Sequence, residues 1–554
     1  MQTCGEVIVH GVSVAAGAIG VNTPAHVFGH LGALFILTHS DPMDRIDEES
    51  QTPAPPVTFT GRKTLVAAAV AVVLIAGALL IRPARTGDDA RPPGPSERAA
   101  TAVGMGAPAA ATDVTALVAD REKWVAAHPD DEASWAVLGS AYLEQARRTA
   151  NPGLYPKAER ALKRSLEERP AEKGNFDAMT GMGALANARH DFATGKKWGE
   201  LVRAQSPKRW TAYPVLVDAY TGLGDYKGAQ AAMELLLELR PGLTAYVRAS
   251  QVYRDRGWRE DAVMAMEEAA ASAKAPAEKA YTLFRLGELA WERGDAREAL
   301  RQYEGALRTD PAQAEGRAGR ARALAALGRA GEALRDYRMA LGRTPVPQLA
   351  RELGELLESL GREQEARAQY DALAALAVRG GAQGVDDAVV LGLYEADHGD
   401  PAAAVRRLSQ EWTRHKSVQV ADALGWALYK SGEYTEALEY AKKAMEPGLR
   451  SAEFAYHRAM VERVLGDEAG ARRHLEEALR TNPYFSPLRG PLAKEALEAI
   501  GQPPPGGPEN IRPTGRWVEP ELPKPNPKPS PAPKAKGGAS KPSAAPSPSA
   551  SASA

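Results

Sequence analysis

The chain has 554 residues, of which 44% are hydrophobic, 25% charged and 6% aromatic, and its 69 basic and 70 acidic side chains give a formal net charge of −1. This balance provides no overall field to attract nucleic acid, so no nucleic-acid partner is expected. Cys4 is the single cysteine, which excludes an internal disulfide framework, a thiolate zinc site and a Cys-x-x-Cys redox pair.

Residues 1–42 contain no Lys or Arg but hold four of the chain's ten histidines. His26 and His30 are spaced i, i+4, which would place two imidazoles on one helical face as metal or haem ligands. One hypothesis is therefore a metal- or haem-binding sensor or redox protein that uses this N-terminal extension. The alternative is that translation begins at Met43 and that residues 43–63 form a short polar N-terminal tail.

Residues 64–81 (TLVAAAVAVVLIAGALLI) are uncharged and are flanked by Lys63 and Arg82. At about 1.5 Å per residue they would span about 27 Å as a helix, close to the ~30 Å of a bilayer's hydrocarbon core. We predict an uncleaved transmembrane helix. A cleaved secretory signal is the alternative, but the segment runs into Arg82-Pro83 without a small-residue cleavage motif.

The orientation of this helix depends on its flanking charges, and basic residues occur on both sides of it. A short N-terminal tail before a single span commonly stays in the cytoplasm. The usage of Ala, Arg, Gly and Pro resembles that of a GC-rich bacterium. We therefore expect a single-pass protein of the plasma membrane whose long C-terminal part is extracytoplasmic.

Residues 82–112 are rich in Pro, Gly and Ala without an apolar period, which predicts a flexible linker. A helical period then continues to about Gly501. Its clearest unit begins with Trp135-x-x-Leu138-Gly139-x-x-Tyr142, a pattern that resembles the tetratricopeptide repeat. The register recurs, because Pro207 and Pro241 are 34 residues apart, as are Ala437 and Ala471.

Ten units share a small residue that opens the second helix of each pair: Ala158, Gly195, Ala229, Ala262, Ala299, Ala333, Ala366, Ala404, Ala437 and Ala471. A glycine precedes it by five residues in most units, at 224, 257, 294, 328, 361, 399, 432 and 466. The small residue lets two helices approach, and the glycine permits a positive φ where the first helix ends. Gly195 and Gly199 replace Ala and an aromatic residue in the second unit, which predicts looser packing there.

The resemblance implies an all-α fold, a right-handed α-solenoid of about ten helix pairs over residues 113–500, with somewhat more than one superhelical turn. It also implies that the first helices form an inner face for protein or peptide partners. Residues 113–128 are predicted to be an unpaired leading helix and residues 488–500 a trailing one, as the caps of the solenoid. The Lys and Asn that would clamp a terminal carboxylate in this family are absent at the matching positions.

Counting inward positions gives the candidate protein-binding residues of this groove: Asp218, Gln251, Arg254, Phe284, Glu288, Trp291, Arg322, Arg351, Glu355, Trp426 and Tyr429. Large aromatic side chains beside mixed charge would suit a bound peptide. The alternative is that Trp291 and Trp426 pack against the next repeat.

No catalytic motif is recognised, and no cofactor or catalytic residue is predicted. Gly181-x-Gly183-x-x-Ala186 matches a dinucleotide fingerprint, but no strand precedes it and the register places it within a helix. Residues 501–554 are rich in Pro, Ala, Ser and Lys and predict a disordered tail, which is either a spacer or an arm toward anionic polymers. The preferred interpretation is a non-catalytic, membrane-anchored scaffold for protein partners or complex assembly.

Overall fold

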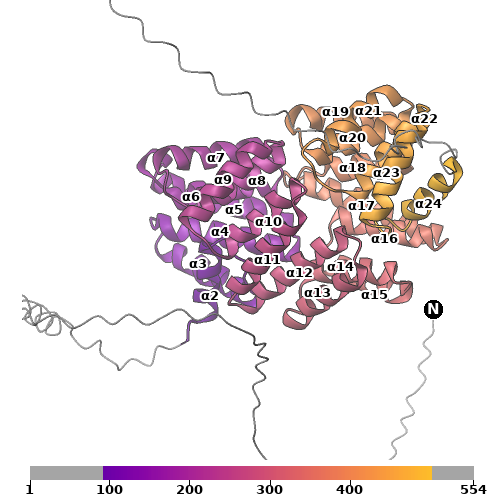
Figure 1. Ribbon diagram of the computed structural model, residues 1–554. Helices are drawn as coiled ribbons and strands as arrows, with labels where there is room; N and C mark the ends of the chain where they lie inside the picture. The colour runs from indigo at the N-terminus through magenta and orange to yellow at the C-terminus, as the bar shows by residue number, and fades with distance from the viewer. Residues whose placement is uncertain (1–91, 502–554) are drawn as a thin grey trace, which may run out of the picture. The chain divides into compact units, whose positions relative to one another are not determined.

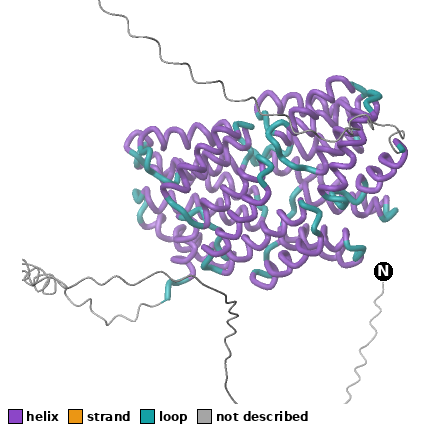
Figure 2. The backbone as a smooth tube through the Cα atoms, in the orientation of Figure 1, coloured by secondary structure: helices purple, strands orange, loops and turns teal. Residues whose placement is uncertain are grey.

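Helices account for nearly all of the regular structure in the computed structural model, which describes residues 92–501. Within this range there are twenty-three α-helices, α2 to α24, and two short 3-10 turns, with no strand (Figure 2). The predicted extension 1–42, tail 43–63, transmembrane segment 64–81 and C-terminal tail 502–554 lie outside the described residues. No helix of the described part is long and apolar enough to cross a bilayer.

Ten antiparallel pairs follow one another along the chain (Figure 1). The first five are α4 (Glu132–Thr149) with α5 (Tyr155–Glu168), α6 (Phe176–Ala188) with α7 (Phe192–Gln205), α8 (Ala212–Leu223) with α9 (Tyr226–Leu239), α10 (Leu243–Asp255) with α11 (Arg259–Ser272), and α12 (Pro276–Glu292) with α13 (Ala296–Thr309). The last five are α14 (Ala314–Ala326) with α15 (Ala330–Arg343), α16 (Pro347–Ser359) with α17 (Glu363–Gly381), α18 (Ala388–His398) with α19 (Pro401–Arg414), α20 (Val418–Ser431) with α21 (Tyr434–Met445), and α22 (Ala452–Val464) with α23 (Glu468–Thr481). The predicted all-α solenoid of ten pairs is confirmed.

The packing within each pair follows the predicted register. The nine alanines that open second helices are each at most 2% exposed, so each helix approaches its partner closely. Tyr303, on α13, is fully buried, and a Cβ placed on Gly287 of α12 would lie 2.5 Å from its Cε1 atom. Glycine on the first helix therefore makes room for tyrosine on the second.

Two expectations about glycines were wrong. A Cβ on Gly199 would lie 2.7 Å from Cδ2 of Leu216, so the second unit is tightly packed there, because the missing side chains let α8 approach α7. Gly399 was expected to have a positive φ, but its φ is −122°. Pro401 begins the next helix and keeps Asp400 extended, which gives this connection another geometry.

The linker prediction for residues 82–112 was also wrong over its second half, which contains α2 (Pro95–Gly104) and the start of α3 (Ala111–Ala127). Pro95 occupies the first turn, the Glu97 carboxylate accepts a 2.8 Å hydrogen bond from the Gly94 amide, and Ala99 is fully buried. Two 2.8 Å hydrogen bonds from Arg98 to Asp113 join α2 to α3. The leading helix α3, which was expected to be unpaired, therefore pairs with α2.

Later repeats pack against earlier ones. The Lys416 amide donates to the Leu223 carbonyl (3.3 Å), and the Asn482 side chain donates to the Trp291 carbonyl (2.8 Å) across 191 residues of sequence. The Arg259 guanidinium donates to the Arg450 carbonyl (3.1 Å), again 191 residues apart. We call this line of contacts the inter-turn seam. At 34 residues per pair, a turn of the solenoid contains between five and six pairs, and ten pairs make more than one turn.

Candidate binding groove

A cavity of about 1010 Å³ lies along the first helices of the N-terminal pairs. We call it the N-terminal groove. Its walls come from α4, α6, α8 and α10, with Tyr281 of α12 at one end. These helices line the same hollow because each first helix in a solenoid repeats the position of the one before it.

Apolar side chains provide much of the groove wall: Val137, Leu143, Phe192, Trp210, Pro214, Val215, Leu243 and Val247. They come from five different segments, so apolar side chains are contributed along the length of the repeats that line the groove. A mostly apolar concave surface with a few fixed polar groups is typical of binding sites.

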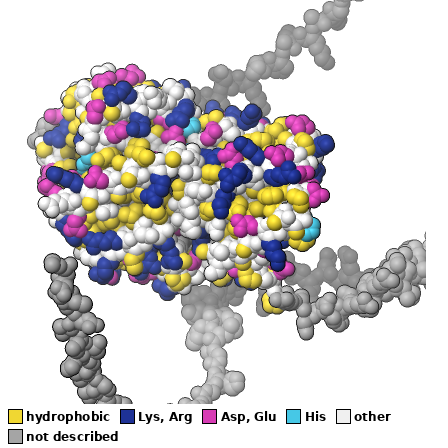
Figure 3. All heavy atoms as spheres, turned by 180° about the vertical axis from the view of Figure 1, so that it is seen from behind, with side chains coloured by type: hydrophobic (Ala, Val, Ile, Leu, Met, Phe, Trp, Pro, Cys, Tyr) yellow, Lys and Arg dark blue, Asp and Glu magenta, His cyan; other side chains and the backbone are white. Residues whose placement is uncertain are grey.

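Three ion pairs lie in the groove wall. Arg147 donates to Glu144 at 2.8 Å, Arg248 to Asp218 at 2.8 Å, and Arg209 to Asp177 at 2.5 Å. The pairs are partly exposed, so each contributes little to stability, and each is neutral, while Lys208 adds one further positive charge to the lining. Basic and acidic side chains are likewise interspersed among hydrophobic ones on the face shown in Figure 3.

One side of the groove is covered by the last residues of α2 and the connection from α2 to α3. We call residues 103–109 the strap. The Thr244 hydroxyl on α10 donates a 2.7 Å hydrogen bond to the Met105 carbonyl, and the Ala109 amide donates a 3.1 Å hydrogen bond to the Glu144 carboxylate on α4. The strap thus joins the first pair to the fourth, and residues 103–108 line the cavity.

Of the predicted groove residues, Asp218 lines the N-terminal groove, where its side chain is 44% exposed. The other ten lie elsewhere on the inner face and contact neighbouring side chains. Gln251 accepts a 2.8 Å hydrogen bond from Arg285. Arg254 donates to Glu292 at 2.8 Å, and its side chain also pairs with Asp255.

The fifth and sixth pairs are connected by a similar set of contacts. Glu288 accepts hydrogen bonds from Tyr303 (2.6 Å) and Arg322 (2.9 Å), and Arg322 also lies 3.4 Å from Glu352. Phe284 packs into the same core, with its ring centroid 6.3 Å from that of Tyr303. Trp291 is only 8% exposed, so this tryptophan packs within the solenoid, in agreement with the alternative interpretation.

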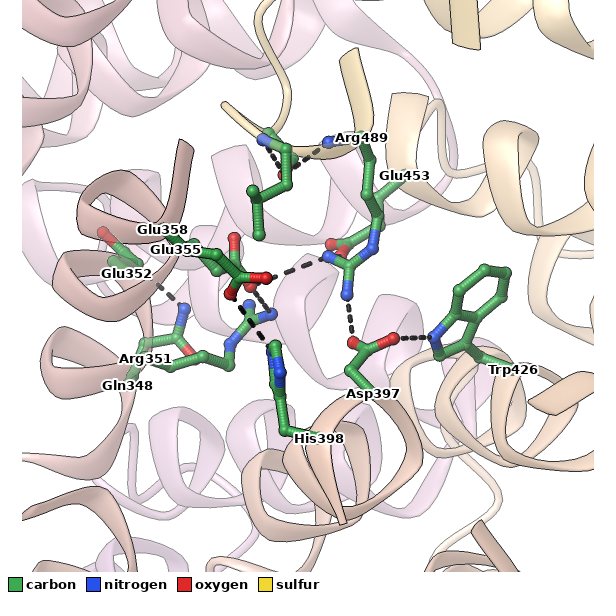
Figure 4. Close-up of polar contacts among 12 residues, drawn as sticks. Gln348, Arg351, Glu352, Glu355, Glu358, Asp397, His398, Trp426, Glu453 and Arg489 are labelled. Atoms are coloured by element: carbon green, nitrogen blue, oxygen red, sulfur yellow. Dashed lines mark hydrogen bonds and ion pairs between the residues drawn. The ribbon is translucent and has the colours of Figure 1, made fainter. Parts of the chain in front are cut away.

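Arg489, at the start of α24 (Arg489–Ile500), points toward acidic side chains of several of the last helix pairs (Figure 4). Its guanidinium pairs with Glu355 (3.6 Å), Glu453 (3.3 Å) and Asp397, and the last of these accepts a 2.9 Å hydrogen bond from the Trp426 indole. Arg351 donates to Glu355 at 2.7 Å, and Tyr429 stacks on Trp426 with centroids 4.9 Å apart. Trp426 is 4% exposed, so it too packs internally.

The pKa values of two carboxyl groups beside Arg489, those of Asp397 and Glu453, lie below their usual range. Burial raises the pKa of Asp397, but the Arg489 guanidinium and the Trp426 N–H outweigh it, and the pKa lies below the usual range. Burial likewise opposes ionisation of Glu453, yet Arg351, His457 and Arg489 lower its pKa. This cluster therefore holds its charges through its own partners and leaves the N-terminal groove as the open part of the inner face.

Sequence reasoning did not identify the strap or Arg489. The Pro/Gly/Ala composition of residues 82–112 concealed both a helix and the strap, although Pro95 followed by Glu97 was a recognisable helix-start signal. Arg489 had no local signal, because its ion-pair partners come from three distant helices. Counting along the first helices did not include Phe192, which begins the second helix α7, or Trp210, which lies in the turn before α8.

Among residues 92–501, no group of three or more His, Cys, Asp and Glu side chains is placed to hold a metal ion. His26 and His30, on which the metal or haem hypothesis depends, lie outside the described residues.

Comparison with known proteins identifies the repeat class. Models described as tetratricopeptide repeat match residues 284–350 and 423–486, and a second such model matches residues 212–242. The chain therefore contains tetratricopeptide repeats, in intervals that coincide with observed helix pairs. No curated protein matches it.

Several solved structures are similar to the chain. The APC/C hetero-tetramer Cut9-Hcn1 has 16% identity and a TM-score of 0.36, covering 66% of this chain and 76% of that one. Yeast Tom70 has 14% identity and a TM-score of 0.30, covering 79% and 93%. A thermophilic TPR protein of Thermus thermophilus has 22% identity and a TM-score of 0.29, covering 34% and 98%.

Proposed function

We propose that this chain is a non-catalytic scaffold that binds a segment of a protein partner in the N-terminal groove. The observation that carries the proposal is the difference between the two parts of the inner face. The groove of the first pairs is open and largely apolar, and its arginines are paired with carboxylates, whereas Arg489 and its carboxylates lie between the last pairs. A partner is therefore accommodated at the N-terminal end.

Site-specific photocrosslinking in cells tests this proposal. A photoreactive residue at Asp218, inside the groove, is expected to capture a partner protein, because its side chain is 44% exposed there. The matched control is Val378, which is 76% exposed on α17 and does not line the groove. Equal capture from both positions, or none from Asp218, would contradict the proposal.

The scaffold is also proposed to be a single-pass protein of the plasma membrane, anchored through residues 64–81, with the solenoid on the extracytoplasmic side. The uncharged composition of this segment supports the anchor. Deleting residues 64–81 is expected to move the protein from the membrane fraction to the supernatant. In a C4S background, V378C is expected to react with a membrane-impermeant maleimide in intact cells, and labelling only after lysis would reverse the proposed orientation.

A further inference from the structure

The strap is bound to the groove mainly through its backbone. The Met105 carbonyl accepts from the Thr244 hydroxyl at 2.7 Å, and the Ala109 amide donates to Glu144 at 3.1 Å. Ala107 and Ala109 are 7% and 3% exposed. An uncharged segment of small residues, crossing from α4 to α10, thus lies in one side of the cavity that a partner would enter.

The sequence of this segment matches the chemistry of the groove. Residues 102–110 read AVGMGAPAA and contain no charged side chain. The arginines of the groove wall are already paired with Glu144, Asp177 and Asp218, so a charged occupant would gain no free counter-charge from these pairs and would lose hydration. A neutral segment avoids that cost and buries its small apolar side chains against the wall.

We propose, on the basis of the proposed function, that the partner of the N-terminal groove is a short, uncharged protein segment of small apolar residues, chemically like the strap, and that it replaces the strap. A backbone carbonyl of the partner accepts a hydrogen bond from the Thr244 hydroxyl, and a backbone amide of the partner donates one to the Glu144 carboxylate. Because both contacts are to backbone groups, the groove selects for lack of charge and small size, with little dependence on residue order.

A reversible disulfide tests whether the strap and the partner compete. A Cβ placed on Gly106 would lie 3.8 Å from Cγ2 of Thr244, so G106C and T244C are close enough to be joined in a C4S background. The probe is a fluorescent AVGMGAPAA peptide, and the protein is the full chain in detergent. Oxidation is expected to weaken peptide binding about tenfold or more, because a locked strap cannot be displaced, and reduction of the same sample should restore it.

Controls separate displacement from other effects. The T244C single variant, treated in the same way, should show no redox dependence. N-methylation of the eighth residue of the peptide, which corresponds to Ala109, should weaken binding, because it removes the N–H that donates a hydrogen bond to the Glu144 carboxylate. A peptide with two Glu residues in place of Ala should bind more weakly than AVGMGAPAA.

Equal binding to the locked and reduced forms would overturn competition with the strap, and absence of peptide binding to the wild-type chain, which keeps the Thr244 hydroxyl, would overturn the chemistry assigned to the partner. If a peptide of residues 542–554 (PSAAPSPSASASA) binds and the strap peptide does not, the groove accepts the chain's own tail and this inference is wrong. Photocrosslinking from Asp218 remains independent of these results, so failure of the inference is distinguished from failure of the proposed function.

Discussion

Asn482 donates a 2.8 Å side-chain hydrogen bond to the backbone carbonyl of Trp291, which precedes it by 191 residues. The two residues belong to successive turns of the same solenoid, and Asn482 is only 2% exposed. The contact therefore gives the carbonyl near the end of α12, which also accepts a 2.9 Å hydrogen bond from the Gly294 amide, a second donor supplied between five and six repeats later. Because of the inter-turn seam, repeats contact not only their neighbours in sequence but also repeats one superhelical turn away.

Replacing Asn482 with Ala is expected to destabilise the solenoid by about 0.5–1.5 kcal/mol, because the buried hydrogen bond to the Trp291 carbonyl is lost while that carbonyl keeps the Gly294 amide as a donor. N151A is a matched control, since the Asn151 side chain accepts from the amide of Gly153 only two residues away and is exposed. Thermal unfolding of the full chain followed by circular dichroism should show a lower midpoint for N482A. Equal midpoints for the two variants would mean that the seam contact adds no stability.

The seam also explains why one turn glycine matters more than another. Gly224 and Gly328 both have a φ of +78°. A Cβ on Gly224 would collide with the Lys416 carbonyl, whereas a Cβ on Gly328 would meet nothing within 4 Å.

Both G224A and G328A incur the left-handed penalty of about 1–2 kcal/mol, but we expect G224A to cost about 1–3 kcal/mol more, because the seam must open. Denaturant unfolding of the two variants measures this difference directly. If both variants lose the same stability, the seam is loose enough to accommodate a methyl group.

The repeat register could be predicted from sequence because it depends on local spacing. Ala299, Ala333 and Ala437 are fully buried where the period placed them, since each contacts only its own pair and the next. The seam could not be predicted, because the position of Asn482 relative to Trp291 depends on a small rotation accumulated over more than five repeats. The strap was missed for a related reason, since its contacts with Glu144 and Thr244 are 35 and 139 residues away.

Ala333 provides a direct test of the register within a pair. It is fully buried at the start of α15, so A333W would overfill the gap between α14 and α15 and is expected to cost about 1–3 kcal/mol or more. V378W is the control, because Val378 is 76% exposed and an added ring there meets solvent. An unchanged unfolding midpoint for A333W would mean that α14 and α15 can move apart to accommodate a tryptophan ring, and that the close packing at Ala333 adds no stability.

Asp397 makes the stability of the last pairs depend on pH. Burial raises the pKa of Asp397, but the larger opposite effect of Arg489, Trp426 and Lys430 lowers it below the usual value. The folded protein therefore holds the carboxyl proton less tightly than the unfolded chain does. The unfolded state therefore binds more protons as the pH falls through the usual carboxyl range, near about 4, and acid favours unfolding. The stabilisation is present above that range and is lost on acidification through the folded pKa.

D397N removes the charge and keeps a similar shape, and we expect it to cost about 1.5–3 kcal/mol at neutral pH, as for a hydrogen bond to a charged group. The difference in unfolding free energy between wild type and D397N should decrease below about pH 4, where the Asp397 carboxylate of the unfolded wild-type chain begins to be protonated. D371N, at an exposed position on α17, should leave the pH profile unchanged. Unfolding midpoints measured between about pH 3 and pH 7 give the comparison, and a D397N deficit that stays constant over that range would mean that Arg489 is held by Glu355 and Glu453 without help from Asp397.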